Sequence, residues 1–111
     1  DDVANYLPAR ITALLIAAAA GSGRAFSYIR RFGHAHASPN SGYPEAALAG
    51  VLDCRFGGTH DYFGTSVYKP YIGVNDRPVT TADMLRSVTV CRRAEIAAVL
   101  LVLLLRLTLR L

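Results

Sequence analysis

The sequence predicts an all-α fragment of a membrane protein, in which two membrane helices flank a polar cytoplasmic segment with a short helix and long loops. Hydrophobic residues make up 52% of the chain and charged residues 18%, whereas soluble domains carry roughly 25% charged residues. The apolar residues are concentrated in two blocks without a charge, residues 11–20 and 96–105. Arginines stand at the inner edges of both blocks, which predicts a multi-pass protein of the cell membrane with residues 21–95 on the cytoplasmic side.

The first segment, residues 1–20, is predicted as a membrane helix. Its charge-free block is shorter than a span, but extension through residues 3–7 brings it to the roughly 20 residues that a span needs. Pro8 is expected in the first turn or at a kink. The Gly-Ser-Gly run at residues 21–23 ends the helix, since glycine readily adopts left-handed backbone angles.

The second segment, residues 21–79, is predicted as a cytoplasmic stretch of loops and short helices that includes a candidate active-site loop. Residues 24–32 are rich in arginine and are expected to form a short helix at the membrane interface. Pro44 has the fixed φ angle of a first helical residue, so a short helix over residues 45–52 follows it.

A long loop then leads into the last segment, residues 80–111, which is predicted as one helix that enters the membrane. Residues 55–79 contain paired glycines, prolines and five aromatic residues, which favours an ordered loop with a short extended piece at residues 66–69. Thr80 and Asp83 have the spacing of a helix-capping box, and neither glycine nor proline interrupts the chain after them.

The charge pattern argues against a nucleic-acid-binding protein. The net charge is +4 and 11 of the 12 cations are arginines, but they border the apolar blocks instead of gathering with aromatic residues on one face. No glycine-rich segment continues into the Gly-Lys-Ser/Thr of a phosphate-binding P-loop. Cys54 and Cys91 are too few and too far apart for a disulfide framework or a zinc site, so two reduced, packed thiols are expected.

The candidate site is centred on the turn at residues 36–50. Pro39 fixes one φ angle and Gly42 allows a positive one, so this turn can aim N–H groups at an anion, and Asn40 adds side-chain donors and an acceptor. Glu45 would lie at the positive end of the following helix, where it stays ionised and could hold Mg²⁺. A tight turn that only starts a helix explains the same residues, and spacing alone does not separate the two interpretations.

The histidines of this turn allow two interpretations. His34 and His36 could share a metal ion if Glu45 or His60 folded back as a third ligand. One hydrogen-bonded imidazole and one solvated imidazole explain the same pair, and motif frequencies favour this second interpretation.

Further polar residues lie outside the turn. Lys69 is the only lysine and could bind a phosphate as a point charge, although an isolated surface lysine explains it more simply. Asn5 and Arg10 are costly in a membrane helix unless they face a hydrophilic pocket. Placement above the membrane interface is the alternative for both.

Several motifs follow one another in an order found in a known family. Residues 1–10 carry Asp-Asp-x-x-Asn-x-x-Pro-x-Arg, and residues 36–47 carry Ser-Pro-Asn-Ser-Gly-Tyr-Pro-Glu-Ala. Gly57-Gly58, Lys69-Pro70 and Thr81-Ala82-Asp83 come next. In these motifs the chain resembles the C-terminal portion of the adenosylcobinamide-phosphate synthase family, integral-membrane proteins of cobalamin biosynthesis, whose central signature has Ala and Trp where this chain has Ser and Tyr.

The resemblance implies an ATP-dependent enzyme that forms an amide. It would join a carboxylate of the corrinoid substrate adenosylcobyric acid to aminopropanol or its phosphate, with Mg²⁺ and ATP as cofactors. The chain begins with Asp1 instead of Met and the family's proteins are longer, so we expect the fragment alone to be inactive. The expected partners are the remaining N-terminal helices of a parent protein and membrane lipid, with no nucleic acid.

The resemblance also implies roles for single residues. Asp2 and Glu45 are expected in metal binding or acid–base chemistry, and His36 is the third expected catalytic residue. The expected substrate-binding and phosphate-binding residues are Arg10, Asn40, Ser38, Lys69 and Asn5.

A function from another class explains the same sequence without catalysis. The chain could be a membrane subunit or scaffold whose polar loop serves as a docking surface. Without the resemblance this interpretation ranks first, because no motif by itself identifies a catalytic group.

Overall fold

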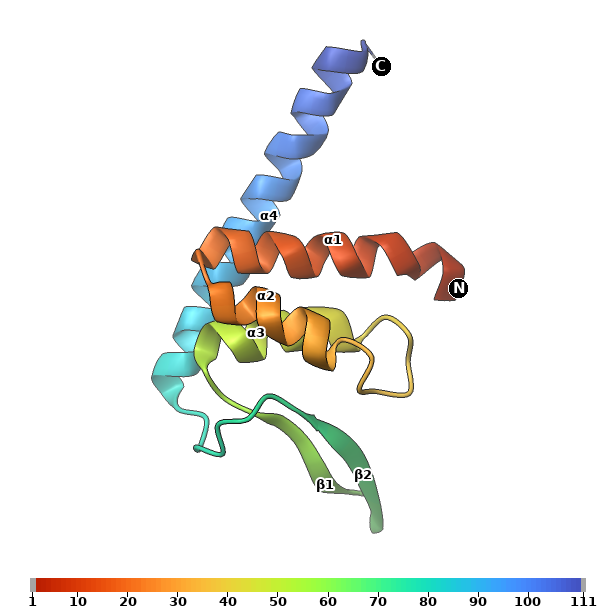
Figure 1. The fold of residues 1–111 in the computed structure, drawn as a ribbon, viewed down its shortest axis with the longest axis vertical. Helices are drawn as coiled ribbons and strands as arrows, with labels where there is room; N and C mark the ends of the chain where they lie inside the picture. The colour runs from red at the N-terminus through yellow and green to blue at the C-terminus, as the bar shows by residue number, and fades with distance from the viewer. Residues whose placement is uncertain (1, 111) are drawn as a thin grey trace.

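The computed structural model describes residues 2–110, which form four helices and one two-stranded antiparallel sheet. Figure 1 shows α1, α2 and α3 stacked side by side, a β-hairpin that curves away below them, and α4, which leaves the stack at an angle. The elements in chain order are α1 (Asp2–Ala20), α2 (Gly23–Phe32), α3 (Gly42–Leu52), β1 (Phe56–Tyr62), β2 (Thr65–Ile72) and α4 (Thr81–Leu109).

Helix α3 is the centre of the stack, because it packs against both α1 and α2. Its buried residues include Ala46, Ala47, Ala49 and Gly50, and side chains this small let helix backbones come close together. A Cβ atom added at Gly50 would lie 2.4 Å from the Cα atom of Ala25 in α2. The small-residue stretch read from the sequence therefore sets the distance between the helices.

The helix ends follow the signals in the sequence, with one shift. α1 ends before Gly21, whose φ angle is +61°. At the start of α4 the Asp83 N–H donates to the Thr80 hydroxyl and the Thr80 N–H donates to the Asp83 carboxylate, which confirms the capping box. α3 begins at Gly42, before Pro44, which is tolerated because N–H groups of a first turn have no partner within the helix.

The predicted pair of membrane helices is wrong. Within residues 2–110, α1 is the one helix that is long and apolar enough to cross a membrane. α4 has 29 residues, but Arg92, Arg93 and Glu95 precede its apolar run and it ends at Leu109. Every 18-residue stretch of α4 therefore includes these three charges, more than such a span contains.

The all-α prediction is also wrong, because a hairpin replaces most of the loop expected over residues 55–79. β1 and β2 pair in antiparallel register from Tyr62↔Thr65 to Phe56↔Ile72, with a bulge between. The turn residues Phe63 and Gly64 have φ angles of 52° and 82°, as in the tight turns that match the twist of paired strands.

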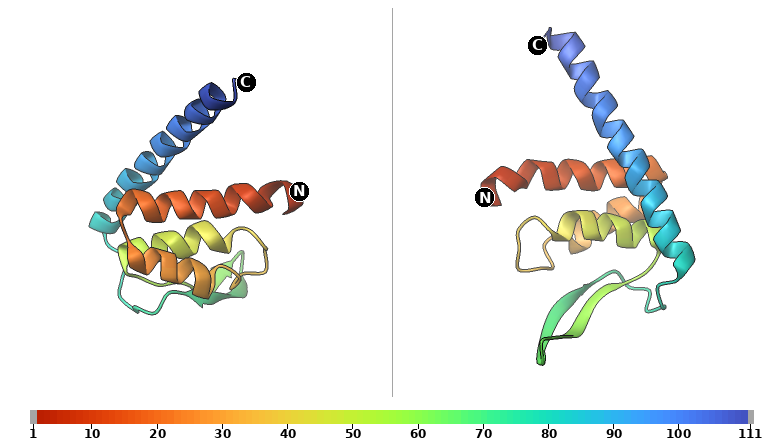
Figure 2. Two further views of the ribbon diagram at one scale, coloured as in Figure 1. Left: turned by 45° about the horizontal axis from the view of Figure 1, so that its top comes forward. Right: turned by 180° about the vertical axis from the view of Figure 1, so that it is seen from behind.

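α4 contacts the stack only over its first half. Val90 and Ala94 are its buried residues, and they belong to the same apolar cluster as Ala13, Ile16 and Ala17 of α1. The two further views in Figure 2 agree that α4 crosses α1 near the end of α1 and then diverges from it. The second half of α4 therefore projects away from the body of the molecule.

Candidate functional site

Asn40 attaches the loop after α2 to helix α1. Asn40 is a buried polar residue, with 7% of its surface exposed. Its Nδ2 donates to the carbonyl oxygen of Asp2 at 3.0 Å, and its Oδ1 accepts from Arg10 Nη1 at 3.2 Å. The Ser38 hydroxyl accepts from the backbone N–H groups of Asn40 and Ser41, each at 3.3 Å. Because its amide is satisfied on both sides, Asn40 fixes the position of the loop.

Arg10 completes this attachment from α1. Its guanidinium donates to the carbonyl oxygens of Tyr6 and Pro39 at 2.9 and 3.4 Å, in addition to the bond with Asn40. It also stacks on the rings of Tyr6 and Tyr43, with centroid distances of 3.5 and 4.1 Å. The structure thus brings the predicted site residues Arg10 and Asn40 into contact, and most of the donors of Arg10 point at the protein itself.

His36 and Glu45 form an ion pair at the other face of the loop. His36 Nδ1 lies 3.4 Å from Glu45 Oε2, and the side chains are 8% and 43% exposed. His36 Nε2 lies 3.2 Å from the carbonyl oxygen of Pro70 in β2. Both ring nitrogens of His36 therefore face an oxygen atom that accepts hydrogen bonds. The ring is held in place, and the carboxylate stays accessible in the first turn of α3.

A groove of about 550 Å³ lies between the start of α3 and the hairpin. It brings together three of the predicted site residues, His36, Glu45 and Lys69. Its walls are formed by His36, Glu45, Leu48, Arg55, Phe56, Gly57, His60, Tyr62, Lys69 and Val79. Four of these side chains are basic and one is acidic, so the groove fits a ligand with an anionic group.

The bases of the groove differ in what they already bind. Arg55 pairs with Asp76 at 2.8 Å and stacks on Tyr71 at 3.8 Å, and His60 Nε2 lies 3.1 Å from the carbonyl oxygen of Gly57. The exposed Lys69 ammonium forms no ion pair with the described residues 2–110. Lys69 is therefore the cation that is free to meet a ligand.

Gly57 explains how the hairpin reaches the loop. Its φ angle is +111°, and a Cβ atom at this position would lie 2.6 Å from the carbonyl oxygen of Pro70. The bulge next to Gly58 lets two strands of unequal length pair, and Gly58 is the partner of Lys69. The glycine pair of the sequence thus places both the carbonyl oxygen that meets His36 and the Lys69 side chain.

Other predicted site residues lie elsewhere. The side chains of Asp2 and Asn5 are exposed on α1 and do not line the groove, and Ser38 serves the turn of the loop. In the part of the chain that the structure describes, no three His, Cys, Asp or Glu side chains are grouped to hold a metal ion. Of the two predicted Mg²⁺ ligands, Glu45 lines the groove and Asp2 does not.

Sequence reasoning missed the structural role of Tyr43. Its hydroxyl lies 2.8 and 3.1 Å from the two ring nitrogens of His34, and the rings meet edge to face. On its other side it carries the Arg10 guanidinium. The position of Tyr43 in the turn motif was the one sequence feature that pointed to this residue. Its contacts with His34 and Arg10 follow no sequence pattern, so they could not be predicted.

Over residues 2–110 the chain combines four helices and a β-hairpin with one candidate membrane helix and a basic groove that contains a carboxylate. The chain belongs to the CobD/CbiB protein family, whose family model matches residues 1–91. This finding confirms the family resemblance seen in the motifs, and with it membership of a family of cobalamin biosynthesis proteins.

Curated relatives agree with this assignment. A cobalamin biosynthesis protein CobD of Geobacter metallireducens is 46% identical over 106 residues, which cover 91% of this chain and 33% of the relative. A CobD protein of Klebsiella pneumoniae is 44% identical and a CbiB protein of Salmonella typhimurium 45%, each over 79% of this chain and 29% of the relative. The chain thus spans about a third of the length of these relatives. No solved structure matches it.

Proposed function

We propose that this chain forms one wall of the active site of a cobalamin-biosynthesis enzyme that joins a carboxylate to an amine. The proposed substrates are adenosylcobyric acid and aminopropanol or its phosphate, with ATP as the source of free energy. The observation that supports the proposal is the groove that contains Glu45, His36 and Lys69. Family membership supports the pathway.

The proposed reaction has two steps, activation of the carboxylate and attack by the amine. ATP supplies a phosphoryl group to a carboxylate oxygen, and ADP leaves. The amine nitrogen then attacks the activated carbonyl carbon, phosphate leaves and the nitrogen loses a proton. Such chemistry needs a cation at the phosphate and a base at the amine.

The groove offers residues for both needs. Lys69 binds a phosphate as a point charge. Glu45 accepts the proton of the attacking amine, because its carboxylate is accessible while His36 holds it in position. Arg10 and Asn40 act as positioning residues, since they fix the loop that carries His36. Mg²⁺ ligation by Asp2 and Glu45 stays a prediction, and no step above depends on it.

The membrane location belongs to the same proposal. α1 is apolar, and Val3, Leu7, Ile11 and Leu14 are exposed along it. Exposed apolar side chains on a helix of this length suit contact with lipid or with other membrane helices. A multi-pass protein of the cell membrane with the groove on the cytoplasmic side is the proposed setting.

An amide-formation assay tests the proposal. We define the reconstituted protein as this chain co-expressed with the part of the Geobacter metallireducens relative that lies outside the matching region. It is incubated in detergent micelles with ATP, adenosylcobyric acid and either amine, and mass spectrometry detects the product. The proposal predicts an amide product that requires this chain. A scaffold role predicts that the remaining part of the relative forms the product equally well alone.

The role of Lys69 is tested separately. Loss of one charge-assisted contact to a phosphate costs about 1.5–3 kcal/mol, so Lys69→Met should raise the KM of the phosphate-bearing substrate about 10- to 100-fold. Asp61→Asn, on the same hairpin but outside the groove walls, is the control and should leave KM unchanged. An unaltered KM in Lys69→Met would contradict the role.

A further inference from the structure

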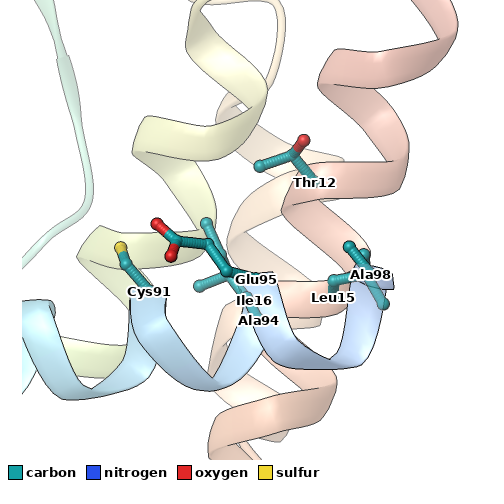
Figure 3. A pocket seen from close by; sticks show the side chains of 7 residues that line it. All are labelled: Thr12, Leu15, Ile16, Cys91, Ala94, Glu95 and Ala98. Carbon is teal, nitrogen blue, oxygen red and sulfur yellow. The ribbon is translucent and has the colours of Figure 1, made fainter. Parts of the chain in front are cut away.

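A second hollow lies on the other side of the molecule, where α1 and α4 cross. It has a volume of about 290 Å³ and is lined by Thr12, Leu15, Ile16, Cys91, Ala94, Glu95 and Ala98. Figure 3 shows the Glu95 carboxylate and the Cys91 thiol reaching from α4 toward the same space, with Thr12 of α1 across from them. Most of the lining is apolar, and Glu95 contributes the one carboxylate among the residues that line the hollow.

The hollow continues along α4. A second depression of about 260 Å³ is lined by Ala98, Val99, Val102 and Leu103. Cys91, Glu95, Ala98 and Val102 are separated by four, three and four positions, which puts them on one face of a helix. We call this face, together with Thr12 and Leu15 of α1, the α1–α4 seam.

We propose that the α1–α4 seam receives a further apolar helix from the part of the CobD/CbiB length that this chain does not span, with a basic or hydrogen-bond-donating side chain opposite Glu95. The chain covers 33% of the Geobacter relative, so two thirds of such a protein remain to supply that helix. The alanines of the seam allow close approach of a second backbone. This inference does not rest on the proposed function.

The charge on the seam distinguishes a helix from lipid as the occupant. Glu95 forms no ion pair within the described residues. A carboxylate that faces hydrocarbon is costly, whereas one that meets a donor on a neighbouring helix is stabilised. Two apolar side chains that line the seam are largely exposed, Val99 at 59% and Val102 at 62%, which leaves apolar area for a helix to cover.

Cys91 provides a natural probe of the seam. It lies in the hollow and is partly exposed, whereas Cys54 is fully buried among the other elements. The rate of maleimide labelling is measured for both thiols, in this chain alone and in the reconstituted protein, within the same micelles. We expect Cys91 labelling to slow about tenfold or more in the reconstituted protein, with Cys54 unreactive in both.

Two variants test whether the protection arises at the seam. Ala98→Phe fills the seam and should restore fast labelling of Cys91 in the reconstituted protein. Leu100→Phe is the control and should leave Cys91 protected, since two residues turn a helix through about 200° and place Leu100 on the opposite face. Leu100 is exposed and Ala98 lies at the edge of the α1–α4 crossing, so circular dichroism of this chain checks that both variants keep the helical fold.

Three results would overturn the proposal. The first is equal labelling of Cys91 with and without the remaining part of the relative. The second is failure of the two chains to co-purify. The third is protection in this chain alone that grows with its concentration, which would make a second copy of the chain the occupant.

Discussion

Arg77 shows how one side chain joins two distant elements. Its guanidinium donates to the carbonyl oxygens of Leu52, Asp53 and Pro78, and it binds both carboxylate oxygens of Asp83 at 2.7 and 2.9 Å. These contacts tie the end of α3 to the start of α4. A planar group with five donors suits such a junction, and no feature of the sequence around Arg77 indicated it.

The junction makes stability depend on pH. Arg77, and then the Thr80 N–H, hold the pKa of Asp83 well below its usual range. A lowered pKa stabilises the folded state at pH values above the unfolded pKa of about 3.9, and this stabilisation is lost as the pH falls below it. Asp83→Asn should therefore be less stable than wild type at pH 7, with a difference that shrinks in acid.

Thermal unfolding followed by circular dichroism in micelles measures this difference across pH 2–7. Asp61→Asn removes an exposed carboxylate of β1 and is the control, with a pH dependence like that of wild type. A constant difference between wild type and Asp83→Asn at every pH would show that the junction does not titrate.

At the scale of elements, the contact between α2 and α3 depends on the absence of a side chain. The nearest atoms to a Cβ at Gly50 belong to the backbone of Arg24 and Ala25, which cannot move without separating the helices. Gly50→Ala should lower the free energy of unfolding by about 1–3 kcal/mol.

The matched control for this packing prediction is Gly23→Ala. Gly23 is likewise a helical glycine, the first residue of α2, and a Cβ there meets nothing within 4 Å. The stability of Gly23→Ala should therefore equal that of wild type or rise slightly. Urea unfolding measures both variants. Equal effects of the two substitutions would show that helix propensity, and not the close contact, governs the loss.

The hairpin shows why an element escaped prediction. Its strands do not alternate between apolar and polar residues, and most of β2 is exposed on both faces, so the usual period of two is missing. Its turn has Phe63 where Asn, Asp or Gly is typical. The glycines and prolines of residues 55–79 indicated turns and a loop. The sheet became visible only in the structure, where β1 and β2 pair on both sides of a bulge.

Phe63 has an unfavourable backbone conformation that a substitution can relieve. Its φ angle is 52° and its ring is fully exposed, so the left-handed conformation costs about 1–2 kcal/mol without a packing contact in return. Phe63→Asn should increase hydrogen-exchange protection of the β1 and β2 amides. Gly64→Ala, at a φ angle of 82°, should decrease it. Lower protection in Phe63→Asn would mean that the ring holds the hairpin.

At the scale of the whole molecule, the order of helices and the closeness of His36 to Glu45 were predictable, while the position of Lys69 and the membrane arrangement were not. Apolar blocks and caps located α1 and α4, but charges early in α4 limit its apolar length. The turn motif contains both His36 and Glu45, which the structure brings within 3.4 Å of each other, while their roles stay predictions. That Lys69 shares their groove depends on a hairpin the sequence did not show, and Asp2 and Asn5 lie outside that groove.

In the proposed function, Glu45 accepts a proton from the amine in the groove beside His36 and Lys69. The most direct measurement is the kcat of amide formation by the reconstituted protein with Glu45→Gln, compared with Asp61→Asn. We expect a loss of about 10²- to 10⁴-fold in kcat for Glu45→Gln and none for Asp61→Asn. A Glu45→Gln protein that forms the amide at the wild-type rate would contradict the account.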